Sequence, residues 1–140
     1  MRAVPTPRVD LPAALLADLR AEAQRALPRE CCGLLEGVRA EDAFTIHALH
    51  PACNLSQDAD CFEIDPRDHF ATVRKVRGKG AAIIGCYHSH PNGEARPSMR
   101  DLAGAGEEGQ LWLILAGDKV NAFVYVDGAF VGAECAASRA

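Results

Sequence analysis

Two histidines stand two positions apart in the segment HSHPNGEARPSMRD, and an aspartate follows eleven positions after the second. These residues are His88, His90 and Asp101. Imidazole nitrogen and carboxylate oxygen are both ligands that zinc accepts in proteins. Three protein ligands with a fourth position open are typical of a catalytic zinc site, whereas structural sites are closed by four. The residue types therefore suggest a site for one zinc ion.

The elements around these residues would have to bring them together. Residues 81–90, AAIIGCYHSH, are apolar almost throughout and predict a buried strand. Since residues i and i+2 of a strand face the same side, His88 and His90 should point together. Pro91 cannot donate to a strand ladder and should end the strand. A short helix is expected over 97–105, with Ser98 as its cap and Asp101 at its third position, folded back over the strand end.

A plainer interpretation uses the same residues. Ser98 and Asp101 also form an ordinary pattern for capping the start of a helix, where an aspartate is favourable. The spacing alone leaves metal binding and simple capping both open. The remaining histidines, His47, His50 and His69, have no comparable set of partners, and we expect them to be structural or exposed to solvent.

The rest of the chain predicts a mixture of helices and strands. We expect a helix over 10–27 that Asp10 caps, and a second helix over 64–80 with Asp65 as its cap and Pro66 in its first turn. Strands are expected at 31–38, 44–50 and 111–115, and a hairpin over 120–135 that turns at Asp127 and Gly128. This mixture indicates an α/β or α+β protein with one sheet flanked by helices.

Composition limits the possible functions. The chain has 140 residues, the usual size of one domain, and 49% of them are apolar. Its formal net charge of −4 weighs against binding to nucleic acid or to anionic membranes. No apolar run approaches the length of a membrane-spanning helix, and the N-terminal residues lack the apolar stretch of a secretory signal, so we expect a cytoplasmic protein. None of the six cysteines forms a C-x-x-C pair, and we expect buried thiols in a reducing compartment.

The site segment resembles the signature of the JAMM metallopeptidases, also called the MPN-plus or JAB family. The match consists of His88-Ser89-His90-Pro91, then Ser98 after six further residues, then Asp101. The family pattern also includes a glutamate at the start of the first strand after the first long helix, and Glu30 in PRECCGLLEG stands there. Further blocks, CFEIDP and LWLIL, are similar to those of short bacterial members. The resemblance extends over residues 10–135 and suggests a single domain over 1–140.

The resemblance implies a role for each matching residue. His88, His90 and Asp101 would bind one zinc ion, Glu30 would be the general acid and base, and the Ser98 hydroxyl would help to hold the attacking water and the developing oxyanion. It also implies a three-layer α/β/α fold with a mixed, mostly antiparallel curved sheet, similar to that of cytidine deaminases.

The implied reaction is hydrolysis of the bond after the C-terminal glycine of a ubiquitin-like protein. Two substrates stay open: a ubiquitin-like sulfur carrier, and a ubiquitin-like modifier that is matured or removed from its conjugates. Sulfur-transfer proteins would accompany the first, and proteins similar to activating (E1) and conjugating (E2) enzymes the second. We expect no nucleic-acid or membrane partner.

Three other functions fit the sequence less well. Family members that serve as inactive scaffolds usually lose the ligands, which are all present here. A DNA-associated relative similar to the RadC proteins fits poorly with the acidic charge. A zinc deaminase would need H-x-E followed by P-C-x-x-C, and the sequence contains neither at the required place.

Overall fold

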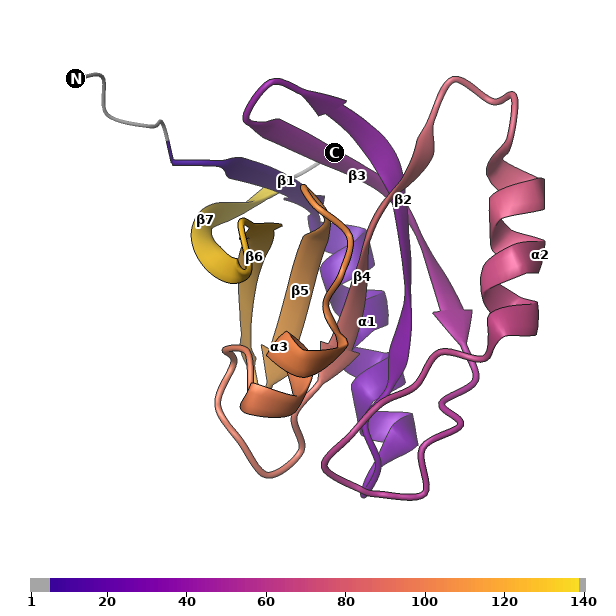
Figure 1. The fold of residues 1–140 in the computed structure, drawn as a ribbon, viewed down its shortest axis with the longest axis vertical. Coiled ribbons are helices and arrows are strands. Elements are labelled where there is room, and N and C mark those ends of the chain that lie inside the picture. Colours follow the sequence, from indigo (N-terminus) through magenta and orange to yellow (C-terminus); the bar gives the residue numbers. More distant parts are fainter. Residues whose placement is uncertain (1–5, 139–140) are drawn as a thin grey trace.

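The computed structural model describes residues 6–138. These residues form seven strands and three helices (Figure 1). In chain order they are β1 (Arg8–Pro12), α1 (Ala13–Ala26), β2 (Cys32–Ala40), β3 (Ala43–Ala52), α2 (Pro66–Val76), β4 (Ala82–Ser89), α3 (Met99–Gly104), β5 (Leu111–Ala116), β6 (Lys119–Val126) and β7 (Ala129–Ser138). The predicted α/β class is confirmed.

The strands form one mixed sheet that closes on itself in the order β1-β3-β2-β4-β5-β6-β7. Strand β1 closes it by pairing in parallel with β3 on one side and β7 on the other. The pairs β2–β3, β2–β4, β5–β6 and β6–β7 are antiparallel, and β4–β5 is parallel. The predicted mixed sheet is therefore confirmed, and its closure into a barrel is a feature that the sequence did not suggest.

The closing strand corrects the prediction of a helix over 10–27. Residues Arg8–Pro12 are a strand, and α1 begins only at Ala13. Asp10 pairs with Thr45 and Ala136 in the sheet, so it does not cap the helix. Burial alternates along β1, with the side chains of Val9 and Leu11 in the core, and this two-residue period stabilises a strand.

Two other local predictions are confirmed. The Asp65 carboxylate accepts a hydrogen bond from the backbone N–H of Arg67, so it caps α2 as expected, with Pro66 in the first turn. The hairpin of β6 and β7 turns at Asp127 and Gly128, whose φ values of 51° and 78° are the left-handed pair that a two-residue type I′ turn requires.

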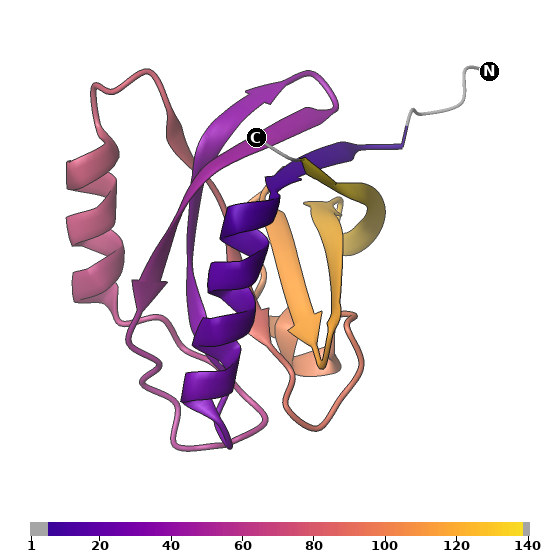
Figure 2. The same cartoon turned by 180° about the vertical axis from the view of Figure 1, so that it is seen from behind.

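Apolar side chains pack on both faces of the sheet. The larger cluster includes Leu35, Tyr87 and Leu113 and packs against Leu19 of α1, which lies behind the strands in Figure 1 and in front of them in Figure 2. The smaller cluster, Leu34, Cys86 and Trp112, uses the alternate residues of the same strands and therefore lies on the other face. The central strands β2, β4 and β5 are thus covered on both sides.

All six cysteines are free thiols. Cys31, Cys32 and Cys86 are buried as expected, whereas Cys53 is exposed, so the prediction of a buried thiol is wrong for that residue. No helix in the part of the chain from 6 to 138 is long and apolar enough to cross a membrane.

Candidate functional site

The two histidines of the HSH segment lie at the end of the central strand β4. His88 is paired with Cys32 of β2 on one side and with Ile114 of β5 on the other, and its side chain is completely buried. His90 follows the last residue of the strand, and its backbone N–H still donates to the carbonyl of Leu115, at 2.7 Å. The sheet therefore fixes the backbone at both histidines.

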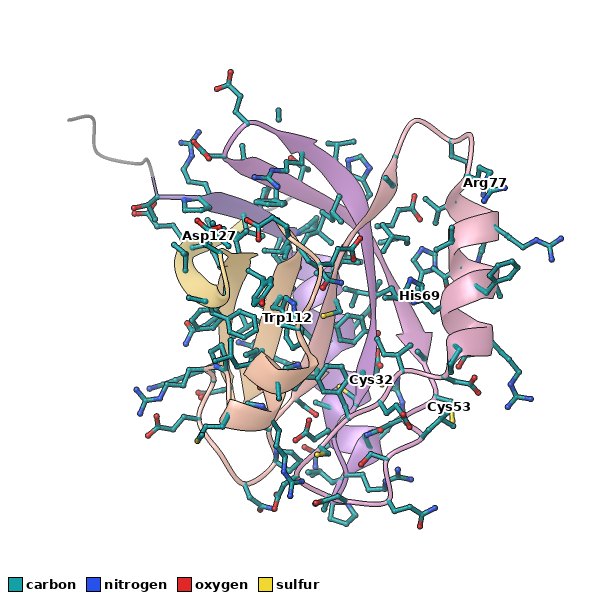
Figure 3. All side chains as sticks on the ribbon, in the orientation of Figure 1. Cys32, Cys53, His69, Arg77, Trp112 and Asp127 are labelled. Atoms are coloured by element: carbon teal, nitrogen blue, oxygen red, sulfur yellow. The ribbon has the colours of Figure 1, made fainter. Side chains whose placement is uncertain are left out.

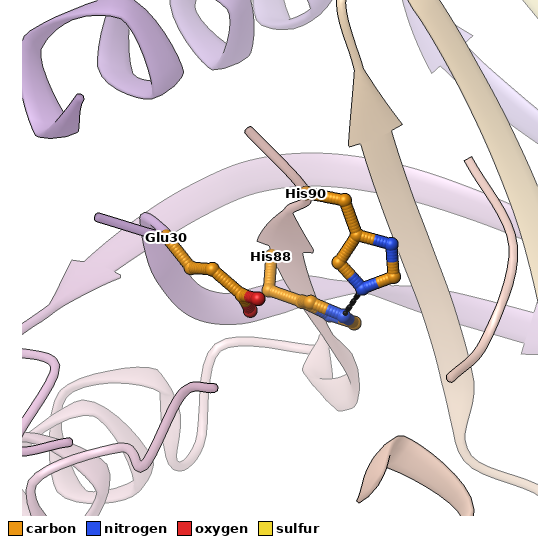
Figure 4. Close-up of side chains that lie close together, drawn as sticks. All are labelled: Glu30, His88 and His90. Atoms are coloured by element: carbon orange, nitrogen blue, oxygen red, sulfur yellow. Dashed lines mark hydrogen bonds between the residues drawn. The ribbon is translucent and has the colours of Figure 1, made fainter. Parts of the chain in front are cut away.

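The antiparallel register of β2 and β4 brings Glu30 to the same place. Because Cys32 lies opposite His88, the residues just before β2 run beside those just after β4. The Ser89 N–H donates to the carbonyl of Cys31 at 3.1 Å and continues this register. Glu30 is buried, and one ligand atom from each of Glu30, His88 and His90 lies within 4.8 Å of the others (Figure 4).

Asp101 reaches the histidines from α3. Ser98 caps this helix by accepting from the Asp101 N–H, and the Ser98 N–H donates to Asp101 Oδ2, so the capping interpretation holds. The same Oδ2 lies 3.1 Å from His88 Nε2 and 3.2 Å from His90 Nε2. Capping and convergence on the histidines are therefore properties of one carboxylate. Ser98 itself is exposed at the rim of the site.

The donor atoms of this cluster fit a metal ion. The two Nε2 atoms are 2.9 Å apart, and with Asp101 Oδ2 they form a triangle whose sides are 2.9, 3.1 and 3.2 Å. A tetrahedral zinc with bonds of about 2.0–2.1 Å separates its ligand atoms by about 3.3 Å. Two imidazole nitrogens and one carboxylate oxygen are also a suitable donor set. The Glu30 carboxylate lies beside this triangle.

Burial and mutual contacts shift the pKa values of the cluster. Burial raises the pKa of Glu30 to about 7, an effect that the nearby His90 partly opposes. Burial lowers the pKa of His88, which favours the neutral imidazole that can bind a metal. Burial also opposes ionisation of Asp101, but hydrogen bonds from His88 and His90 outweigh it and hold the pKa of Asp101 below its usual range.

Two buried polar atoms of the cluster have no hydrogen-bond partner among residues 6–138. They are Oε1 of Glu30 and Nδ1 of His88. A buried polar atom without a partner costs about 1–3 kcal/mol, and such atoms often mark functional sites. Glu30 therefore presents a free acceptor at the point where the two histidines and Asp101 converge.

Aromatic side chains form one wall of the site. The Phe62 ring stacks on the His88 ring with centroids 4.3 Å apart and planes inclined by 21°. The Trp112 ring packs edge-on against the same imidazole, with ring centroids 5.7 Å apart. Trp112 stood in a predicted buried strand, but no periodic signal surrounds Phe62, which lies on the segment between β3 and α2.

A cleft of about 330 Å³ opens beside Asp101. Leu34, Phe62, Ile64 and Trp112 give it a mainly apolar wall, and His69 of α2 lies at its edge (Figure 3). The cleft therefore runs along the outer face of the sheet toward α2.

The other histidines stay outside the cluster, as expected. His47 and His69 are exposed, and His50 Nε2 lies within hydrogen-bond distance of Glu36 Oε1, at 2.7 Å. All five residues with a proposed role, Glu30, His88, His90, Ser98 and Asp101, lie in or directly beside one site.

Comparison with known proteins agrees with this geometry. Residues 12–126 match the family model Prok-JAB, the prokaryotic homologs of the JAB domain. The chain belongs to this family. It is 32% identical to the desampylase of Haloferax volcanii over 74% of each chain. It is 30% identical to the "Probable TtuB-protein conjugate cleaving protease" of Thermus thermophilus, over 84% of this chain and 76% of that protein.

A solved structure is also similar. The solution structure of a Desulfitobacterium hafniense protein has 30% identity and a TM-score of 0.85, with 94% of both chains covered. The resemblance to the JAMM family is thus confirmed, and the family match spans both Glu30 and Asp101.

Proposed function

We propose that this chain is a zinc-dependent peptidase or isopeptidase that cleaves the bond after the C-terminal glycine of a ubiquitin-like protein. The observation that carries the proposal is the convergence of three donor atoms within 2.9–3.2 Å of one another, with the free carboxylate oxygen of Glu30 beside them. The family membership and the relatives named for peptide or conjugate cleavage support it.

His88 Nε2, His90 Nε2 and Asp101 Oδ2 would hold the zinc. When bound, zinc lowers the pKa of a coordinated water toward about 7 and polarises a substrate carbonyl. The backbone hydrogen bonds of β4 and the cap of α3 hold these ligands in place before substrate arrives. Such preorganisation keeps a catalytic site from reorganising during the reaction.

Glu30 would move the protons of the reaction. Its unpartnered Oε1 can accept a proton from the attacking water and then deliver it to the departing amine. A pKa near neutrality suits a group that must both accept and release a proton at neutral pH. Transfer of this kind typically contributes a factor of about 10²–10⁴.

Ser98 would stabilise the oxygen of the scissile carbonyl. Its Oγ already accepts a hydrogen bond from the Asp101 N–H, which leaves the hydroxyl hydrogen available as a donor. A donor placed where negative charge develops favours the tetrahedral transition state. Ser98 lies at the exposed rim, where a substrate can reach it.

The cleft suggests how the substrate tail is bound. An extended tail can be held through its main-chain groups, so the side chain at its last position determines whether it can approach the zinc ligands. Phe62, Ile64 and Trp112 line a cleft of about 330 Å³ beside Asp101, and a substrate tail bound in this cleft would pass that wall to reach the zinc ligands. We therefore infer that a tail ending in glycine, which has no side chain, is the preferred substrate. Relatives named as a TtuB-protein conjugate cleaving protease and as a CysO-cysteine peptidase both match this chain, so a conjugated modifier and a carrier protein both stay candidate substrates.

A defined fusion tests this function. The protein should cleave a β-grasp ubiquitin-like protein, fused through its terminal glycine to a short peptide, directly after that glycine. Replacing the terminal glycine with valine should block the reaction, because a branched side chain would collide with the cleft wall. Mass spectrometry identifies the cut. Cleavage at an unrelated position, or equal rates on both substrates, would contradict the proposal.

The two longer helices, α1 and α2, pack against the sheet. We propose that α1 and α2 are the outer layers of a three-layer α/β/α arrangement similar to that of cytidine deaminases, and that residues 1–140 form one domain. The packing of α1 on the larger apolar cluster, and the contacts of α2 with β2, β3 and β4, support this arrangement. Limited proteolysis should leave one resistant core from β1 to β7, and early cleavage into two stable pieces would contradict it.

A further inference from the structure

One peptide group beside the site is held from two sides by side chains. The carbonyl of Glu30 accepts a hydrogen bond from Asn54 Nδ2 at 3.0 Å. The next N–H, that of Cys31, donates to Ser89 Oγ at 2.8 Å. Asn54 comes from the segment after β3, and Ser89 stands between the two histidines on β4. Both polar groups of the Glu30–Cys31 peptide are therefore bound by side chains from different parts of the chain.

The Glu30 side chain lacks comparable support. Its Oε1 is buried without a hydrogen-bond partner in the part of the chain that the structure describes. The carboxylate nevertheless points toward His88 (Figure 4). Because no side-chain bond to that oxygen fixes this direction, the direction depends on the orientation of the backbone at Glu30. The peptide held by Asn54 and Ser89 sets that orientation.

Asn54 is itself fully bonded. Its Nδ2 donates to the carbonyls of Glu30 and Cys61, and its Oδ1 accepts from the N–H groups of Ser56 and Glu63. Two carbonyls on one side of the amide and two N–H groups on the other allow only one orientation of the side chain. An aspartate here could still accept from both N–H groups, but it would turn a carboxylate oxygen toward two carbonyl oxygens.

We propose that Asn54 is a positioning residue for Glu30. It holds the Glu30–Cys31 peptide against Ser89, so that the Glu30 carboxylate faces the histidines of β4. The inference rests on the proposed function, in which Glu30 transfers protons. A displacement of about 1 Å in a reacting group can cost about 100-fold in rate, so a lost hydrogen bond to this peptide should be visible in turnover.

The variant Asn54→Asp tests the proposal, with Gln57→Glu as its matched control. Both variants change an amide to a carboxylate on the same segment, and the Gln57 side chain is exposed. On the glycine fusion, Asn54→Asp should lower kcat by about 10–100-fold while KM and zinc content stay unchanged. Gln57→Glu should stay within about twofold of the wild-type kcat, since solvent and salt largely screen the charge of an exposed side chain.

A double variant separates positioning from a general effect on the segment. If Asn54 acts through Glu30, adding Asn54→Asp to Glu30→Gln should cause no further loss of kcat. An unchanged kcat in Asn54→Asp, a change confined to KM, or losses that multiply in the double variant would each overturn the proposal.

Hydrogen exchange tests the same contact without any substrate. The Cys31 amide should exchange at least about tenfold faster in Asn54→Asp and in Ser89→Ala than in the wild type, and at the wild-type rate in Gln57→Glu. Unchanged exchange of Cys31 in Asn54→Asp would overturn the positioning role even if the enzyme is active. Failure of the wild type to cleave any fusion would overturn the proposed function alone, because the exchange experiment still reports on the peptide.

Discussion

Strand β4 ends between two polar clusters, one on each face of the sheet. On the outer face, His88 converges with His90 and Asp101. On the inner face, the Tyr87 hydroxyl donates to the Glu22 carboxylate of α1, with oxygen separations of 2.8 and 3.0 Å. The titratable groups of both clusters are shielded from water. Each cluster includes one of two neighbouring residues of β4, Tyr87 or His88.

The clusters differ in how well their hydrogen bonds are satisfied. In the inner cluster the Tyr87 hydroxyl and the Glu22 carboxylate form a hydrogen bond with each other, so the donor and the acceptor both have a partner. In the outer cluster two imidazole nitrogens 2.9 Å apart face one carboxylate oxygen, and Glu30 Oε1 has no partner among the described residues. Buried polar atoms that lie close together without all forming hydrogen bonds indicate a binding site. A buried donor and acceptor that bond to each other indicate a structural contact.

The largest expected effect comes from removing the proton carrier of the outer cluster. Glu30→Gln keeps the shape of the side chain but cannot take up a proton, so kcat should fall by about 10²–10⁴-fold. Zinc content should change little, because Glu30 is not proposed as a ligand. Steady-state kinetics and elemental analysis check this, and a variant as fast as the wild type would remove Glu30 from the mechanism.

A change on the inner face should reduce stability instead. A Cβ atom at Gly33 would lie 2.3 Å from the Tyr87 hydroxyl oxygen and 2.5 Å from the carbonyl oxygen of His50. Gly33→Ala should therefore lower the free energy of unfolding by about 1–3 kcal/mol, as overpacking typically does. Urea denaturation measures the loss. Gly132→Ala is the control, because no atom of the described residues lies within 4 Å of a Cβ added there. Equal stabilities of the two variants would contradict this.

The smallest expected effect is a pH dependence that originates in the inner cluster. Burial raises the pKa of Glu22, although the hydrogen bond from Tyr87 partly opposes this. A raised pKa means that the folded state favours the protonated form, so this contribution to stability is present below the ordinary pKa of glutamate and is lost as the pH rises through the folded-state value. Glu22→Gln should therefore gain stability relative to the wild type as the pH rises from 4 to 7. Urea denaturation at both pH values measures the difference in free energy of unfolding between the variant and the wild type. A difference that stays constant or shrinks as the pH rises would contradict this prediction.

Much of the site could be predicted from the sequence, because its residues are close together in the chain or follow strong local rules. Ser98 and Asp101 obey helix-capping preferences, and His88 and His90 obey the two-residue period of a strand. Glu30 could be added only through the family resemblance. Its place beside the histidines depends on the pairing of β2 with β4, which local patterns do not specify.

The missed features depend on contacts between distant segments. Residues 8–12 form a strand because they pair with both β3 and β7. The helical pattern of α1 follows them without a break, so the sequence did not indicate a separate strand. Phe62 and Asn54 lie in the irregular segment between β3 and α2, where no period indicates which side chains turn inward. Their roles became visible only through the ring stacked on His88 and the bond to the Glu30 carbonyl.

The zinc content of three purified proteins tests the central claim most directly. After dialysis against buffered zinc, elemental analysis should find about one zinc ion per chain in the wild type. The variant Tyr87→Phe, which alters only the inner cluster, should keep that zinc, whereas His88→Ala combined with His90→Ala should lose nearly all of it. Full occupancy in the double histidine variant, or none in the wild type, would contradict the assignment of the outer cluster as the metal centre.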